Sequence, residues 1–245
     1  MVITSKSNPL IKDIIKLSGD RKYRRAAGLF VVEGLKPVTE CINSDCIIER
    51  IVCREDMLDN FPQAVAVSEG VFDAISTEKA PRGVLALVHM PQNKADKPQG
   101  SCLLLDRIQD PGNLGTIIRT ANAAGYDELY LINCTDAYSP KAVRASMSGI
   151  FFVKIYECTA EEAFCALSDV PLICADMDGE DIFTFTPPKK YCLCIGNEGG
   201  GISDEVMNKS QYKVKVPMRE SCESLNAAIS AGIAMYQLKN SLLRG

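Results

Sequence analysis

After residue 101 the chain alternates short apolar segments with amphipathic ones, and this alternation is the feature that most constrains its fold. The apolar segments are almost continuously hydrophobic, which is typical of strands buried on both faces of a parallel sheet. Strands are predicted at 102–106, 128–132, 172–175, 191–195 and 212–216, and helices at 114–124, 141–148, 161–167, 204–209 and 224–243. The sequence therefore predicts an α/β fold whose parallel sheet is covered by helices.

The first ninety residues predict a separate, small α/β domain. Residues 9–17 have helical periodicity, and residues 29–34, 47–52 and 84–88 have the composition of strands. A polar stretch with two prolines and a glycine follows them and is typical of a linker. We therefore expect an N-terminal domain over 1–92, a linker over 93–100 and a second domain over 101–245.

The charge of the chain is unevenly distributed. The whole chain has a net charge of −4, but residues 1–36 hold eight basic and three acidic residues, a net of +5. A local basic patch can bind phosphates on an otherwise acidic protein, although a solvated helix face would give the same pattern. The candidate RNA-binding residues are Lys6, Lys12, Arg21, Lys22, Arg24 and Arg25.

Histidine and cysteine usage excludes several chemistries. The single histidine, His89, argues against a Ser-His-Asp triad and against histidine-ligated metals. The eleven cysteines include no Cys-x-x-Cys pair, so we expect reduced thiols, no metal site and a cytoplasmic protein. No apolar run approaches the ~20 residues that span a bilayer, and the N-terminus does not resemble a secretory signal, so no membrane association is expected.

Three polar loops follow predicted strands, where ligands bind in parallel sheets. In the first, Asn113 is expected to cap the following helix, and Gly115 is expected to leave open space beside Arg119, one turn later. In the second, residues 196–201 form a glycine-rich turn that would let the backbone approach a ligand closely. The third, residues 217–226, precedes a helix rich in small residues. Taken alone, each loop has a plainer explanation. The first could hold a surface arginine, the second could be an ordinary turn, and the third could reflect buried helix packing.

The three loops together resemble the SpoU/TrmH family of SPOUT RNA methyltransferases. The matching strings are Asn-Leu-Gly-Thr-Ile-Ile-Arg-Thr at 113–120, Ile-Gly-Asn-Glu-Gly-Gly-Gly-Ile at 195–202, Val-Pro-Met at 216–218 and Ser-Leu-Asn-Ala at 224–227. Residues 144–149 also resemble a family segment, and residues 8–12 and 28–34 resemble the substrate-binding domain often fused before these enzymes. One departure is Glu220, where the family often has glycine.

The resemblance implies a trefoil knot in the second domain and S-adenosylmethionine as cofactor. It further implies a homodimer with the site near its interface, for which the small-residue helix face of Ala227, Ala231 and Ala234 would suit close packing. The implied cofactor-binding residues are Gly196, Asn197, Gly201, Val216, Met218, Leu225 and Asn226. The implied catalytic residues are Arg119, Asn113, Glu198, Ser224 and Asn226.

The implied reaction is methylation of a ribose 2′-hydroxyl, with ribosomal RNA favoured and transfer RNA as the alternative. Arg119 would be the central catalytic residue, either as a base or as an electrostatic stabiliser of the alkoxide; a guanidinium stays protonated in proteins, which suits stabilisation better. Two rival interpretations are a non-catalytic RNA-binding protein of the same fold and a methyltransferase acting on a base nitrogen. A fragment starting at residue 101 is expected to retain cofactor binding and lose RNA affinity.

Overall fold

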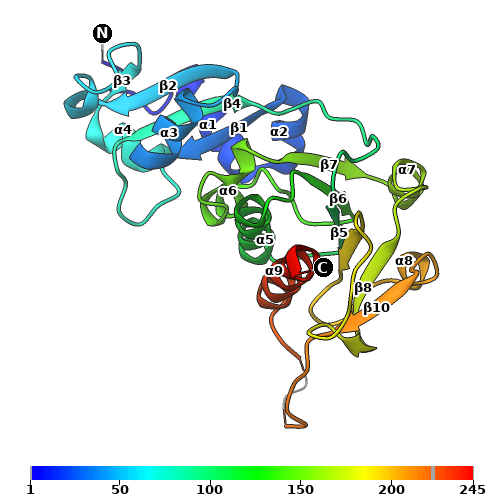
Figure 1. Cartoon of the computed structure of the whole chain (residues 1–245). Coiled ribbons are helices and arrows are strands. Elements are labelled where there is room, and N and C mark those ends of the chain that lie inside the picture. The colour runs from blue at the N-terminus through cyan, green and yellow to red at the C-terminus, as the bar shows by residue number, and fades with distance from the viewer. Residues whose placement is uncertain (1, 222–223, 245) are drawn as a thin grey trace. The chain divides into compact units, whose positions relative to one another are not determined.

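The structure, a computed structural model, describes residues 2–221 and 224–244, and it divides into two compact units (Figure 1). Unit 1 comprises the residues up to Gln92 together with Asp136–Phe151, and unit 2 comprises Asn93–Thr135 and the residues from Phe152 onward. The segment 136–151, which the sequence predicts to belong to the second domain, therefore packs within unit 1.

Unit 2 is built on a six-stranded sheet in the order β10-β8-β9-β5-β6-β7, and every neighbouring pair is parallel. The predicted parallel sheet is confirmed. Its strands are β5 (Cys102–Asp106), β6 (Glu128–Ile132), β7 (Lys154–Cys158), β8 (Leu172–Asp181), β9 (Cys192–Ile195) and β10 (Tyr212–Lys215). Strand β7 was not predicted, because it lies at the sheet edge and its residues are only partly buried and partly polar.

The helices of unit 2 are α5 (Pro111–Ala124), α7 (Ala160–Ala166), α8 (Asp204–Met207) and α9 (Ala227–Arg244). Helices α5 and α9 pack side by side (Figure 1). The small-residue face of α9 lies inside the unit, since Ala231 and Ala234 are buried and a side chain at Gly232 would meet Thr120 of α5 at 3.7 Å. The expectation that this face packs against a second chain is therefore wrong: it packs within its own.

Unit 1 has a four-stranded mixed sheet in the order β1-β4-β2-β3. Its elements are α1 (Pro9–Gly19), α2 (Arg21–Ala27), β1 (Leu29–Glu33), α3 (Leu35–Ile42), β2 (Ile48–Arg54), η1 (Glu55–Met57), β3 (Val65–Val67), α4 (Glu69–Ile75) and β4 (Val84–His89), with α6 (Pro140–Ala145) and η2 (Gly149–Phe151) from the later segment. The predicted helical stripe is confirmed: Ile14 and Leu17 of α1 are buried against Phe72 of α4 and the sheet.

A buried ion pair joins α2 to the later segment of unit 1. The guanidinium of Arg24 donates from Nε and Nη2 to Asp136 at 2.9 and 2.7 Å, and from Nη1 to the Leu17 carbonyl at 2.6 Å. The side chains of Arg24 and Asp136 are only 5% and 6% exposed. The assignment of Arg24 as an RNA contact is therefore wrong, because its donors are used inside the protein.

The predicted linker residues run along unit 2 as an anchored segment. Asn93 donates to the Ile155 carbonyl at 3.3 Å, and the hydroxyl of Tyr130 donates to the Asp96 carbonyl. Lys190 donates to the Pro98 carbonyl. None of the helices in the described ranges is long and apolar enough to cross a membrane.

Candidate functional site

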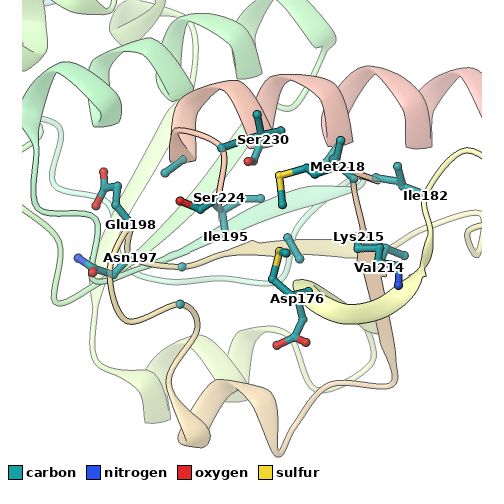
Figure 2. Close-up of a pocket in the computed structure, with 18 of the residues that line it drawn as sticks. Asp176, Ile182, Ile195, Asn197, Glu198, Val214, Lys215, Met218, Ser224 and Ser230 are labelled. Carbon is teal, nitrogen blue, oxygen red and sulfur yellow. The ribbon is translucent and has the colours of Figure 1, made fainter. Parts of the chain in front are cut away.

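A cavity of about 290 Å³ opens at the carboxyl ends of β8, β9 and β10 in unit 2 (Figure 2). Its walls come from the strand ends, the glycine-rich loop and the start of α9. The lining residues are Ala175, Asp176, Met177, Ile182, Ile195, Gly196, Asn197, Glu198, Gly199, Gly201, Val214, Lys215, Val216, Met218, Ser224, Leu225, Ala227, Ser230 and Ala234. Figure 2 shows Asn197 and Glu198 on one side of the cavity and Val214 and Lys215 on the other.

The glycine-rich loop folds back on itself at the cavity wall. Asn197 and Gly201 exchange two backbone hydrogen bonds of 3.0 and 2.9 Å. A Cβ atom at Gly196 would lie 2.3 Å from the carbonyl carbon of Gly201, so only glycine fits there. The Asn197 side-chain oxygen also accepts from the backbone N–H groups of Gly199 and Gly200, at 2.9 and 3.0 Å. The loop is thus a fixed wall held by its own backbone.

The residues at the end of β5 are hydrogen-bonded to the glycine-rich loop and to the residue that follows it. The side-chain amide of Asn197 donates to the Arg107 carbonyl at 2.9 Å, and the backbone N–H of Ser203 donates to Asp106 at 2.6 Å. Asp106 is a buried carboxylate at the end of β5, and Arg107 adopts a positive φ of 59°. Sequence reasoning did not assign either residue to the site; the charged residue ending an otherwise apolar strand was the available signal.

Asn113 in the first turn of α5, Glu198 of the glycine-rich loop and Asn226 before α9 form one hydrogen-bonded cluster. Asn113 donates through Nδ2 to Oε1 of Glu198 at 2.5 Å, and Asn226 donates through Nδ2 to Oδ1 of Asn113 at 3.0 Å. Asn113 is not the helix cap that was expected: α5 begins earlier, at Pro111, and Asp110 caps it by accepting from the Asn113 backbone N–H at 2.9 Å. This frees the Asn113 side chain for the cluster.

The third loop reaches the cavity with Met218, Ser224 and Leu225. Helix α9 begins at Ala227, three residues later than predicted, because Asn226 acts as its cap: Oδ1 accepts from the backbone N–H groups of Ala228 and Ile229, at 3.0 and 3.3 Å. Asn226 itself does not line the cavity, although the predicted site residues Ser224 and Leu225 do.

Arg119 lies apart from this cluster. It is exposed on α5, does not line the cavity, and has no hydrogen bond or ion pair within the described residues. Six helical residues separate it from Asn113, which places it about 9 Å along the helix axis and on another side of the helix. Gly115 is buried. Its position therefore does not support the expectation that it leaves open space beside Arg119.

Asp176, Lys215 and Ser230 also line the cavity but were not predicted as site residues. Asp176 lies within β8 but directly follows the predicted strand at 172–175, and a charged residue after an apolar run was the signal that could have found it. The pairing of β8 with β10 shifts register between Lys213 and Val214, and this irregularity gave no recognisable sequence pattern.

The other basic candidates in unit 1 are accessible. Lys6, Lys12, Arg21 and Lys22 are exposed on or before α1 and α2. The Arg25 side chain is 37% exposed, and its guanidinium lies 3.7 Å from Asp136.

The sequence of this chain matches two family models and several known proteins. The model of the SpoU rRNA Methylase family matches residues 100–236, and that of an MRM3-like substrate binding domain matches residues 8–86. A 23S rRNA (guanosine(2553)-2'-O)-methyltransferase of Bacillus subtilis (strain 168) is 31% identical, over 97% of this chain and 98% of the relative.

Two solved structures extend the similarity to the fold. An AdoMet-bound rRNA methyltransferase of Sinorhizobium meliloti has a TM-score of 0.90 and 29% identity, covering 99% of this chain and 98% of that one. A SpoU methyltransferase of Streptomyces viridochromogenes in complex with AdoMet has a TM-score of 0.86 and 27% identity, covering 97% and 99%.

Proposed function

This chain belongs to the SpoU rRNA methylase family, and we propose that it transfers the methyl group of S-adenosylmethionine to a ribose 2′-hydroxyl of ribosomal RNA. The observation that carries the proposal is that two loops distant in sequence, both within the matched family region, line one cavity, and that Asn113 of α5 joins Glu198 and Asn226 of these loops in a single polar cluster. The named relatives methylate 23S rRNA at guanosine or uridine riboses.

The cavity suits a cofactor of this kind. Its volume of about 290 Å³ is near the lower end of small-molecule sites, which span about 300–1,000 Å³. Apolar side chains such as Ile195, Val216 and Leu225 line it, and the carboxylates of Asp176 and Glu198 provide negative charge for a cationic ligand. We propose that the cofactor lies against the wall formed by Gly196 and Gly201.

When bound, S-adenosylmethionine supplies an electrophilic methyl group on a positively charged sulfur. The chain's own task is to orient the ribose oxygen and assist loss of its proton. Asn113 fixes Oε1 of Glu198, and Asn226 fixes Asn113 in turn. We propose that the second oxygen of Glu198 accepts a hydrogen bond from the ribose hydroxyl, with Ser224 beside it on the cavity wall.

Arg119 would then act as an electrostatic group. Its side chain is exposed and bonds to none of the described residues, so its fork of donors is available to RNA. Removing one such preorganised donor from an active site typically lowers the rate by about 10²–10³. A proton-abstracting role would require the guanidinium to lose its charge, which guanidinium groups in proteins do not readily do.

We propose that unit 1 binds the RNA. Its residues 8–86 match a substrate-binding domain, and Lys12, Arg21 and Lys22 present positive charge on neighbouring helices. Arg25 can contribute through its exposed part, whereas Arg24 is committed to Asp136.

We also propose a homodimer that uses the exposed side of α9. Ile229 and Tyr236 are 54% and 53% exposed, and seven residues place them two turns apart on one face. Light scattering is expected to give about twice the chain mass of 26.7 kDa. A fully active monomer would contradict the proposal. The trefoil knot and the cytoplasmic location stay predictions.

The decisive experiment is to incubate the protein with S-adenosylmethionine and either ribosomal or transfer RNA, digest the RNA to nucleosides and identify the methylated species by mass spectrometry. A 2′-O-methylnucleoside from ribosomal RNA supports the proposal. Its appearance only in transfer RNA would select the alternative substrate. A base-methylated product, or binding without methylation, would reject ribose methylation.

A further inference from the structure

A second cavity, of about 520 Å³, opens in unit 1 between α1, α2 and the sheet. Its floor is apolar: Leu17 and Leu87 are buried there, and Leu10 and Leu29 are partly buried. Its volume lies within the range of about 300–1,000 Å³ that is typical of small-molecule sites. The cavity therefore has the size and the floor to hold one flat ring system.

A bulge in β2 turns two charged side chains toward this cavity. The residues on either side of Glu49 pair with two consecutive residues of β4, so Glu49 is an extra residue in the strand. Consecutive residues of a regular strand point to opposite faces, whereas here both Glu49 and Arg50 line the cavity. Glu49 lies 3.0 Å from Nε2 of His89, but Arg50 forms no hydrogen bond or ion pair with the described residues. The donors of Arg50 are therefore available to a ligand.

Helices α1 and α2 contribute a carboxylate that a tyrosine holds in place. The hydroxyl of Tyr23 donates to Oδ1 of Asp13 at 2.8 Å, and both side chains line the cavity. A carboxylate has about four acceptor sites, so Asp13 can still accept hydrogen bonds from a ligand. Positive charge surrounds the pair: Nζ of Lys16 lies 5.2 Å from the centre of the Tyr23 ring, and the neighbouring residues Lys12 and Lys22 are exposed. These lysines can contact the phosphates of a nucleic acid that enters the cavity.

We propose that this cavity binds one unpaired guanine base of the RNA, an inference that rests on the proposal that unit 1 binds RNA. Guanine carries two adjacent donors, N1–H and the N2 amino group, which match the acceptor-only carboxylate of Asp13. Its O6 and N7 are acceptors of the kind that arginine contacts, which suits Arg50. Adenine, cytosine and uracil each place an acceptor beside the corresponding donor, and a carboxylate repels it. Unpaired RNA bases are commonly bound in this way, by their edges and beside an aromatic ring such as that of Tyr23.

Fluorescence anisotropy with the full chain tests the proposal in the absence of S-adenosylmethionine. Labelled RNA heptamers are uridine throughout except at the centre, which is guanosine, inosine or uridine. We expect the guanosine heptamer to bind about tenfold more tightly than the all-uridine one. The inosine heptamer should lie between them, because inosine lacks the N2 amino group.

Asp13→Asn tests the carboxylate, because the asparagine oxygen can still accept from Tyr23. This variant should lose the preference for guanosine but bind the all-uridine heptamer at least as tightly as wild type does. Asp59→Asn is the matched control, since Asp59 is exposed in unit 1 and does not line the cavity, and it should keep the preference.

The proposal is overturned if the wild-type protein binds the three heptamers equally or not at all, or if the preference survives in Asp13→Asn. Guanosine monophosphate that binds as tightly as the guanosine heptamer would also overturn it, because the cavity would then be a site for free nucleotides. No methyl group is transferred in this assay, so its result is separate from the proposed reaction. Methylation of ribosomal RNA without a guanosine preference would reject only the guanine site, and a guanosine preference without methylation would reject only the reaction.

Discussion

Replacing Gly196 with alanine should weaken cofactor binding while leaving the chain folded. The new Cβ would lie 2.3 Å from the Gly201 carbonyl carbon and 2.4 Å from both the Gly201 oxygen and the Ile202 nitrogen. All three are backbone atoms, so no side-chain rotation relieves the overlap. The glycine-rich loop must open, and the paired backbone hydrogen bonds between Asn197 and Gly201 must lengthen or break.

The expected loss of binding free energy follows from those two hydrogen bonds. Each backbone hydrogen bond contributes about 1 kcal/mol net, and overpacking of this kind costs about 1–3 kcal/mol. If the bound state requires the closed loop, a loss of about 2 kcal/mol weakens S-adenosylmethionine binding about thirtyfold. The same cost lowers the melting temperature by only about 4–8 °C in a chain of this size.

Titration calorimetry measures the affinity of each variant for S-adenosylmethionine, and Gly200→Ala is the matched control. A Cβ at Gly200 meets only the Asn197 side-chain oxygen, at an ordinary 3.8 Å, and alanine keeps the backbone N–H that this oxygen accepts from. The control should bind as wild type does. Wild-type affinity in a folded Gly196→Ala variant would refute the assignment of this loop as the cofactor wall.

Three further predictions concern other parts of the chain. Asp136→Ala leaves the buried Arg24 unpaired and should cost about 3–5 kcal/mol, read as a melting temperature about 10 °C lower; an unchanged melting temperature would contradict the buried-pair interpretation. Arg119→Ala should bind cofactor normally but transfer methyl groups about 10²–10³ times more slowly, and rescue by lysine would show that charge rather than fork geometry matters. The double variant Arg21→Ala, Lys22→Ala should reduce the log–log salt slope of RNA binding by about 0.9 for each lost phosphate contact, and an unaltered slope would exclude these residues from the interface.

The elements that could be predicted are those whose hydrophobic pattern is clear within a short stretch of sequence. Strands β5 and β6 have the predicted bounds, because each is buried along its whole length and, apart from one acidic residue at one end, is a run of uncharged, mostly apolar residues. Edge strand β7 was missed because its residues are mixed polar and apolar, and helices α2 and α3 were missed because they are only 7 and 8 residues long, too short to be stable without packing.

At the site, the sequence indicated which loops meet but not how their side chains are used. Asn113 is of a residue type common at helix caps. The helix begins before Asn113, because Asp110 caps it and Pro111 suits its first position. The contact of Asn113 with Asn226 joins residues 113 positions apart, which no local pattern reveals. For the same reason, a count of charges in residues 1–36 did not separate the buried Arg24 from its exposed neighbours.

The segment 136–151 changes how the two units should be separated. A fragment starting at residue 101 would keep this segment but lose the partners that bury it: Asp136 would lack Arg24, and Tyr138 would lack the Phe30 ring, whose centroid lies 5.0 Å from its own. We therefore expect trypsin to cleave this fragment rapidly after Lys141 and Arg144, which are exposed but helical in the full chain and hence protected there. Limited proteolysis followed by mass spectrometry measures both rates. Equal protection of these two bonds in the fragment and the full chain would show that the segment folds without unit 1. Rapid cleavage would mean that the roles of the two units are better separated by single substitutions than by truncation.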